Sequence, residues 1–164
     1  MTGAPSLFTM LDQGPSAPAV LPWDYVRMRR QAAGRSIEQA ARPYWHRPEH
    51  QADVERNFRM FESVGFRLER GFYVVDMSRS HPLDIDIYRQ LCTGDPRRHP
   101  RLCMACGWDP LTQSFDRYGD DVVWSAIDPG ICTACEQEGR PRFEPRPDEF
   151  HPASTIRPQR AVTT

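Results

Sequence analysis

The chain has 164 residues, of which 39% are hydrophobic and 26% charged, and its formal net charge is −1 at pH 7. This length can bury one moderate core, or one helical core together with a small metal-held module, and we expect the second arrangement. The sequence has no apolar run near the roughly 20 residues that span a bilayer, so we expect a cytoplasmic protein with no membrane partner.

Residues 1–22 and 139–164 differ in composition from the middle of the chain. The first segment contains four prolines and two glycines around a short apolar cluster, and the second is rich in proline and arginine. Both segments hold too few apolar residues to form a core of their own. We therefore interpret them as a disordered N-terminal tail and a Pro/Arg-rich C-terminal tail.

Residues 23–94 are predicted to form a mainly helical domain. Asp24 is placed to cap a helix over residues 25–33, because its side chain can accept a hydrogen bond from the first turn. Gly34 follows as the natural residue to end this helix, since glycine adopts the left-handed conformation that closes many helices. The first helix is therefore expected to span about nine residues.

A second, short helix is expected after Ser36. The sequence Ser-Ile-Glu-Gln has the capping-box form, in which the Ser and Gln side chains satisfy reciprocal backbone donors. Pro43 disfavours helical geometry at the residue before it, so this helix should span about two turns. Pro48 then suits the first turn of a third helix. Three residues at spacings i, i+4 and i+7 give that helix one apolar stripe: Val54, Phe58 and Phe61.

A short β-hairpin is predicted over residues 66–75, where two apolar segments flank Gly71. Asp84 then begins a further helix that ends near Cys92. The fold class is therefore mainly α with a short β-hairpin. The expected core of the domain consists of Met28, Ile37, Ala40, Val54, Phe58 and Phe61, with Trp23, Tyr44 and Trp45 at its edges.

Residues 25–41 carry an arginine-bearing helix that ends in Ala-Gly-x-Ser, followed by a capped helix with an x-x-Ala-Ala pattern. This segment resembles the first two helices of phage-repressor-type helix-turn-helix regulators. The resemblance implies DNA binding, with contacts mainly to phosphates; a three-helix bundle that binds no DNA is an equal alternative. The arginines expected at the DNA are Arg27, Arg30, Arg35, Arg42 and Arg47. The first two should lie on the solvent-facing flank of the first helix.

Two C-x-x-C pairs follow a basic, Pro-rich linker at residues 95–102, and 25 residues separate the pairs. Each pair bends the backbone into a knuckle that presents two thiolates to one tetrahedral ion. The alternative is a set of buried free thiols or disulfides. The fifth cysteine and the lack of a signal peptide favour a reducing compartment and a metal site. We therefore predict one structural zinc in a module over residues 103–138, with four ligands: Cys103, Cys106, Cys132 and Cys135.

The pattern C-x-x-C-G, then a tryptophan, then D-x-x-x-C-x-x-C resembles small zinc-ribbon segments of phage and prophage proteins. It is carried by Cys103, Cys106, Gly107, Trp124, Asp128, Cys132 and Cys135. The resemblance implies metal binding. The residues from Cys106 to Pro110 also look like the first knuckle of rubredoxin, in which four thiolates hold iron, so a rubredoxin-like electron carrier is a further alternative.

The sequence has no catalytic constellation, so we expect that the protein is not an enzyme. Zinc-stapled HNH nucleases need His and Asn near the cysteine pairs, and residues 107–131 contain neither. Four cysteines also close a zinc site, whereas catalytic zinc keeps an open position. The five histidines are expected at the surface, with His99 the only one placed to compete for the metal.

Two functions remain from these observations. The first is a zinc-containing DNA-binding regulator of phage or prophage type, with DNA as its partner. The alternative is a zinc-stabilised protein-binding adaptor, or an inhibitor of a host complex, for which zinc ribbons supply rigid docking surfaces. Four aromatic residues of the module suit such an interface: Trp108, Phe115, Tyr118 and Trp124. The sequence leaves the oligomeric state open.

Overall fold

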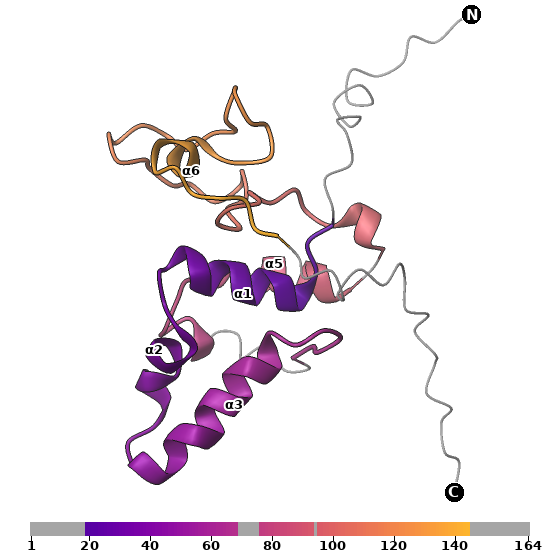
Figure 1. Cartoon of the computed structure of the whole chain (residues 1–164). Coiled ribbons are helices and arrows are strands. Elements are labelled where there is room, and N and C mark those ends of the chain that lie inside the picture. Colours follow the sequence, from indigo (N-terminus) through magenta and orange to yellow (C-terminus); the bar gives the residue numbers. More distant parts are fainter. Residues whose placement is uncertain (1–18, 69–75, 94, 145–164) are drawn as a thin grey trace, which may run out of the picture.

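The computed structural model describes residues 19–68, 76–93 and 95–144, and this part of the chain is mainly helical (Figure 1). Its α-helices are α1 (Pro22–Ala32), α2 (Ile37–Ala41), α3 (Gln51–Phe61), α5 (Ile85–Cys92) and α6 (Thr133–Gln137). Short 3-10 helices span Arg42–Tyr44, Pro48–His50 and Pro96–Arg98. None of the helices in the described ranges is long and apolar enough to cross a bilayer.

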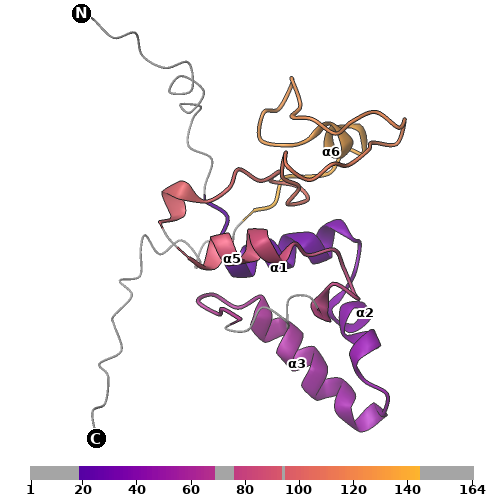
Figure 2. The same ribbon diagram turned by 180° about the vertical axis from the view of Figure 1, so that it is seen from behind.

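The molecule has two parts that lie on opposite sides of α1. Helices α1, α2, α3 and α5 form the helical body, which comprises the described residues from 19 to 93. Residues 103–138, which we call the Cys module, carry α6 and several irregular loops. In Figures 1 and 2 the Cys module lies on one side of α1, and α3 lies on the opposite side. Helix α1 is therefore the element that both parts share.

Helix α1 begins earlier than the sequence suggested. Its N-cap is Leu21, which supplies no side-chain cap, and Pro22 occupies the first helical position. Proline is favoured there because its missing N–H has no intrahelical acceptor in any case. Asp24 therefore does not cap the helix but lies in its first turn, where the helix dipole stabilises a carboxylate. The helix ends as predicted, with Gly34 at φ 65°.

The capping box of α2 is confirmed. Ser36 Oγ accepts a hydrogen bond from Gln39 N at 3.2 Å, and Ser36 N donates one to Gln39 Oε1 at 2.9 Å. Arg42, where Pro43 was expected to disfavour helical geometry, has helical angles of φ −51° and ψ −41°. The α-helix nevertheless ends at Ala41, and with the 3-10 helix Arg42–Tyr44 the segment spans about two turns, as predicted. Pro43 lies in the first turn of the 3-10 helix that continues α2, where its ring fits and its missing N–H costs nothing. The chain becomes extended only at Trp45.

Helices α3 and α5 present the predicted apolar stripes. Phe58 is buried, and its ring lies 5.3 Å from that of Tyr44. Asp84 caps α5, since its Oδ1 accepts hydrogen bonds from the backbone N–H groups of residues 86 and 87. The stripe of α5 is fully buried: Ile87, Tyr88 and Leu91. Residues 66–68 form no strand, and the rest of the predicted hairpin lies outside the described residues.

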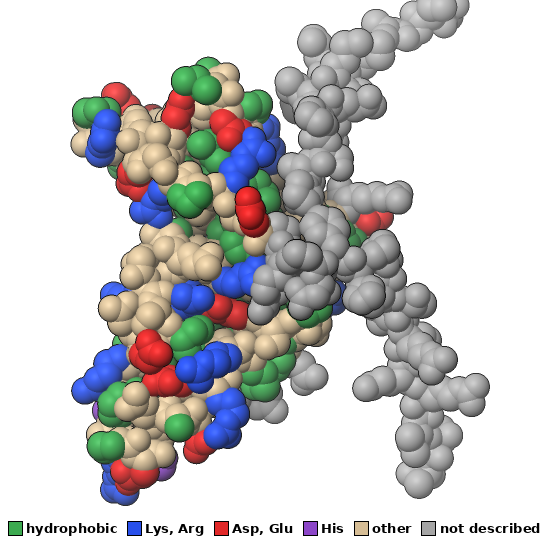
Figure 3. Space-filling model, in the orientation of Figure 1, with side chains coloured by type: hydrophobic (Ala, Val, Ile, Leu, Met, Phe, Trp, Pro, Cys, Tyr) green, Lys and Arg blue, Asp and Glu red, His purple; other side chains and the backbone are tan. Residues whose placement is uncertain are grey.

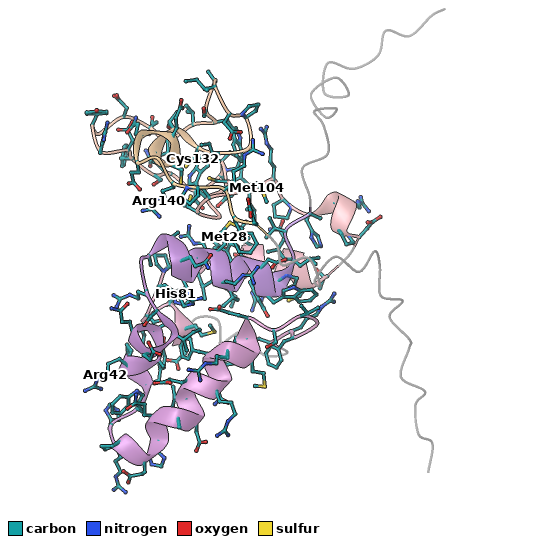
Figure 4. The ribbon with its side chains drawn as sticks, in the orientation of Figure 1. Met28, Arg42, His81, Met104, Cys132 and Arg140 are labelled. Atoms are coloured by element: carbon teal, nitrogen blue, oxygen red, sulfur yellow. The ribbon has the colours of Figure 1, made fainter. Side chains whose placement is uncertain are left out.

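The core of the helical body extends past its predicted end. Leu102 and Met104 are buried with the helices, whereas Cys103 between them is buried in the cysteine cluster. The side chains of Leu102 and Met104 thus enter one cluster and that of Cys103 enters the other. Met104 lies in the same buried cluster as Met28 of α1, and both are marked at the junction in Figure 4. Residues 102–104 therefore belong to both parts of the molecule.

Candidate metal centre

The four predicted ligands come together at one point of the Cys module. Their sulfur atoms all lie within 4.8 Å of one another. The separations are 3.8 Å between Cys103 and Cys135 and 3.9 Å between Cys106 and Cys132. A tetrahedral zinc with Zn–S bonds of about 2.3 Å separates its sulfurs by about 3.8 Å. The four cysteines are thus close enough, and arranged suitably, to bind one metal ion.

The first knuckle closes on itself through two backbone hydrogen bonds. Cys103 N donates to Trp108 O at 2.7 Å, and Gly107 N donates to Cys103 O at 2.8 Å. Gly107 adopts φ 74°, a left-handed conformation that favours glycine. A Cβ atom at this position would lie 2.9 Å from the side chain of Arg29 and 3.2 Å from the ring of Tyr25. The turn needs glycine both for its backbone and for its close approach to α1.

The second knuckle begins helix α6. Cys132 is the N-cap residue of this helix, and Cys135 lies one turn further on. The backbone N–H of Cys132 also donates to the sulfur of Cys103 at 3.3 Å, which joins the two knuckles. An antiparallel bridge pairs Trp124 with Cys132 and anchors the long loop beside the site. The positions of the sulfurs in both knuckles are therefore fixed by backbone hydrogen bonds.

The site is closed to solvent and electrostatically suited to a cation. Cys103, Cys132 and Cys135 are buried, and Cys106 is partly buried. Hydrogen bonds with the other three thiols lower the pKa of Cys103, whereas the contacts that Cys135 makes with its three neighbouring thiols raise the pKa of Cys135. The sulfurs alone thus share their protons unequally. A bound dication would stabilise all four as thiolates, and four protein ligands leave no open position for a substrate.

Little apolar packing supports the cysteines. Trp108 and Trp124 lie edge to face with their ring centroids 5.3 Å apart, and Trp108 Nε1 donates to Thr112 O at 2.9 Å. The only other buried hydrophobic residues of the described cluster are Val122 and Ile131. Such a small cluster would not hold a module of this size in one conformation without further bonds. Metal ligation is therefore the main candidate for what fixes its fold.

Sequence analysis missed the contact between the site and α1. Arg29 Nη1 donates to Cys106 O at 2.8 Å, while its Nε donates to Pro82 O at 2.9 Å. One guanidinium thus ties the first knuckle to the segment before α5. No local signal marks this contact, because Arg29 and Cys106 are 77 residues apart.

Two of the five arginines predicted at the DNA are not on a solvent-facing flank. Arg27 is 8% exposed, lies 3.4 Å from Asp24, and stacks over the ring of Phe143. Arg30 donates from Nε and Nη2 to the two carboxylate oxygens of Glu62, at 2.6 and 2.8 Å. The prediction of their exposure is wrong because residues distant in sequence cover that side of α1.

The other three predicted arginines are exposed. Arg35 follows the end of α1, and Arg42 and Arg47 lie in the connection between α2 and α3. Arg42 stacks over the ring of Trp45 at 4.3 Å. Figure 4 shows Arg42 near the end of the body that lies away from Cys132. Arg42 and the cysteine site therefore lie at different ends of the molecule.

Two histidines are also placed differently from the expectation. His81 is buried, and its Nδ1 lies 2.7 Å from Ser80 Oγ. Burial lowers the pKa of His81 to about 4, with a further contribution from Arg30 and other arginines nearby. His99 does not join the cysteines, because its Nδ1 lies 3.1 Å from Val20 O.

Charge is distributed unevenly between the two parts. Residues 103–138 contain seven acidic residues against one arginine, a net charge of −6, whereas residues 19–93 carry twelve arginines and ten acidic residues. A zinc ion with four thiolates would add a further −2 to the Cys module. The module is therefore an acidic surface attached to a mildly basic body, and its field repels phosphate groups.

Compared with family models, with curated proteins and with solved structures, the chain shows no match in any of the three.

Proposed function

We propose that the protein is a zinc-stabilised adaptor that binds another protein through the surface of its Cys module. The closed set of four sulfurs suits a structural ion, and zinc is the usual ion in such sites, although iron accepts the same ligands. In this proposal the metal has no chemical step to perform. It holds rigid a module whose surface does the binding.

The observation that carries the proposal is the exposure of large apolar side chains on this small module. The exposed fractions are 92% for Leu111, 86% for Ile127, 68% for Tyr118, 60% for Phe115 and 54% for Val123. Single exposed apolar residues are common on any protein, but a group of them on one small module is typical of an interaction site. Figure 3 shows hydrophobic side chains at the outer ends of the module.

A DNA-binding regulator is the second candidate, and the exposure of Arg35, Arg42 and Arg47 favours it. It ranks below the adaptor for two reasons. Arg30 could reach a phosphate only by leaving its ion pair with Glu62, and breaking a partly buried pair is costly. In addition, the acidic Cys module would not serve as a second DNA contact.

Affinity capture from a lysate of the host cell tests the adaptor proposal. The zinc-loaded full chain should retain one partner in stoichiometric amount. A variant in which the five exposed apolar residues of the module are replaced by serine should retain none. The matched control replaces Met60 and Val64 by serine, because these residues are 42% and 47% exposed on the helical body. Equal retention by all three proteins would overturn the adaptor proposal.

A gel-shift titration at two salt concentrations tests the second candidate. DNA affinity should fall by about 0.9 decade per phosphate contact for each decade of salt. Replacement of Arg42 and Arg47 by alanine should weaken binding with little loss of stability, because neither side chain forms an ion pair with a described residue and Arg42 contacts its near neighbour Trp45 at the surface. Absence of a shift at low salt would rule out the regulator.

A further inference from the structure

Four acidic residues of the Cys module form a first group that stabilises the protein's own structure, whereas Asp120 and Asp121 form a second group. In the first group, Asp128 and Glu138 pair with arginines of the C-terminal segment, and Asp109 and Asp116 hold turns of the module. Asp109 accepts hydrogen bonds from Leu111 N and from Thr112 Oγ1, at 2.9 and 2.6 Å. Asp116 accepts from the backbone of the turn that follows it and from Gln137 Nε2 at 2.6 Å. Carboxylates in such positions accept hydrogen bonds from backbone N–H groups that have no backbone acceptor, and they thereby stabilise the turn. They are not available to a partner.

The second group has no such structural role. Asp120 and Asp121 are exposed, and neither carboxylate has a hydrogen bond or an ion pair with a described residue. Both lie in the loop of residues 114–123. These two charges are therefore fully available to a partner, at the edge of the module.

The geometry of this loop places apolar groups beside the free carboxylates. Phe115 and Asp121 face each other in an antiparallel bridge, and Val122 N donates to Ser114 O at 2.8 Å. Residues paired in this way project to the same side, as do residues two positions apart. Phe115, Asp121 and Val123 thus share one side of the loop, while Val122 points to the opposite side and is buried against the cysteine cluster.

We propose that the end of this loop, formed by Phe115, Asp121 and Val123 on one side and by Tyr118 and Asp120 in the adjoining turn, docks a basic, apolar segment of a protein partner. The proposal rests on the adaptor function and specifies its partner. A Lys or Arg side chain of the segment contacts the two carboxylates, and apolar side chains on either side of it cover the exposed rings and Val123. Arg117 already lies over the ring of Tyr118, 4.7 Å from its centroid, so the ring of Phe115 is the aromatic face that could attract a cation of the partner.

Charge complementarity selects this occupant over others. The module's net charge of −6 attracts a basic segment over distances of about 8–10 Å in physiological salt, and it repels acidic segments and nucleic acids. The apolar groups supply most of the affinity once water is displaced, while the exposed charges contribute mainly orientation and association rate. A segment with both features fits the loop better than a purely basic or a purely apolar one.

A displayed library of random 12-residue peptides, selected on the zinc-loaded full chain, tests the proposal. Selected peptides should be enriched in Lys or Arg next to Leu, Ile or Phe. A synthetic peptide of the enriched sequence should bind about tenfold more weakly to the double variant Asp120→Asn, Asp121→Asn. Its affinity for the wild type should fall by a similar factor as salt rises from 50 to 500 mM. Fluorescence anisotropy measures both effects.

The apolar half of the site has its own matched pair of variants. Phe115→Ser with Val123→Ser should weaken peptide binding more than tenfold. Leu111→Ser with Ile127→Ser removes two exposed apolar residues from other turns of the module and should change binding less than twofold. Equal zinc content and circular dichroism of all variants would exclude misfolding.

The outcomes separate this inference from the adaptor function itself. Selection of acidic or uncharged peptides, binding unaffected by the two Asp→Asn changes, or no enrichment at all would each overturn the docking inference. Recovery of a stoichiometric partner that depends on the five apolar residues would then leave the adaptor function standing on another face of the module. Loss of both signals would overturn the two proposals together.

Discussion

The helical body and the Cys module differ in the size of the apolar core that stabilises them. The body buries a cluster of thirteen hydrophobic residues, whereas the cluster of the module has six buried members, three of which are cysteines. Burial of apolar surface stabilises the first by roughly 25 cal/mol per Å². In the second, a metal ion bound by the four cysteines would supply the bonds that the small cluster lacks. The difference teaches that one part of a chain can be fixed by a large apolar core while another part keeps a small core and leaves several apolar side chains exposed.

The comparison has an exception at the junction. Leu102 and Met104 reach from the edge of the module into the core of the body, and Arg29 reaches from the body to the carbonyl of Cys106. Loss of the metal should therefore reduce the stability of both parts, and that of the Cys module more. The predictions below test how far each part depends on the other.

Removal of the metal should have the largest effect. Ligand binding in zinc-finger peptides contributes about 10–16 kcal/mol at pH 7, more than the total stability of many small domains. A strong chelator should therefore abolish amide protection in residues 103–138, while α3 and α5 keep most of theirs. Hydrogen exchange by mass spectrometry measures this. Simultaneous loss of protection in α3 would show that the two parts form one cooperative unit.

Metal analysis of the fresh protein should find about one zinc per chain, and a red iron chromophore would contradict the assignment of zinc.

Met104→Ala should destabilise the helical body although this residue lies outside the body's own sequence. The side chain is buried with α1 and α5, so its truncation leaves a cavity that costs about 2–5 kcal/mol. Thermal unfolding followed by circular dichroism of the helices measures the change. Met60→Ala is the matched control, because Met60 is exposed on α3 and should lose less than about 0.5 kcal/mol. Equal effects of the two changes would mean that residue 104 does not complete the core.

Gly107→Ala should reduce stability at the contact between the two parts. The left-handed backbone costs a non-glycine residue about 1 kcal/mol or more, and the new Cβ would crowd Arg29 and Tyr25. Overpacking of this kind adds about 1–3 kcal/mol. Gly119→Ala separates the two costs, because Gly119 has φ 87° but open space around its Cα. Urea unfolding of both variants should give a larger loss for Gly107, and a similar loss for both would indicate that the knuckle does not press on α1.

Acidification should weaken the body through His81. Its pKa of about 4 in the folded protein lies below the ordinary value of 6.5, so the unfolded chain binds the proton more tightly. The contribution of His81 to stability is therefore complete above pH 6.5 and decreases as the pH falls toward 4. At pH 5 the loss is about 2 kcal/mol.

The variant His81→Asn isolates this titration from the protonation of the cysteines, which both proteins share. Urea unfolding at pH 7 and pH 5 should show a smaller decrease for the variant than for the wild type. The arginines that face His81 (Arg29, Arg30 and Arg35) stay charged over this range and leave the sign unchanged. An equal decrease in both proteins would show that His81 does not titrate between these pH values.

Features that depend on neighbours in the sequence could be predicted. The capping box at Ser36, the cap at Asp84 and the four-cysteine cluster each follow from a short pattern with a geometric meaning. The end of α1 at Gly34 follows in the same way. The start of α1 was not predicted correctly. Asp24 and Pro22 are both typical of helix starts, and in the structure Pro22 is the first helical residue.

Features that depend on distant residues could not be predicted. Glu62 binds Arg30 across 32 residues, and Arg140 of the C-terminal segment donates to Ala32 O across 108 residues. Periodicity assigned the sides of α1 from its own sequence and had no means of locating these partners. The same limit applies to residues 102–104, whose division between two clusters depends on both parts being folded.

The alternation of Leu102, Cys103 and Met104 between two clusters also governs what happens while the chain is being synthesised. Helices α1, α2, α3 and α5 leave the ribosome before Leu102 and Met104, which follow Cys92 by 10 and 12 residues, and the fourth sulfur, that of Cys135, follows Cys92 by 43 residues. At elongation rates of about 5–20 residues per second, the delay is about 0.5–2.4 seconds for the two core residues and about 2–9 seconds for the last sulfur. The nascent helical body exposes the apolar surface that Leu102 and Met104 later cover only during the first of these delays. A metal ion held by all four cysteines can therefore bind only after the residues that complete the core of the helical body have been synthesised.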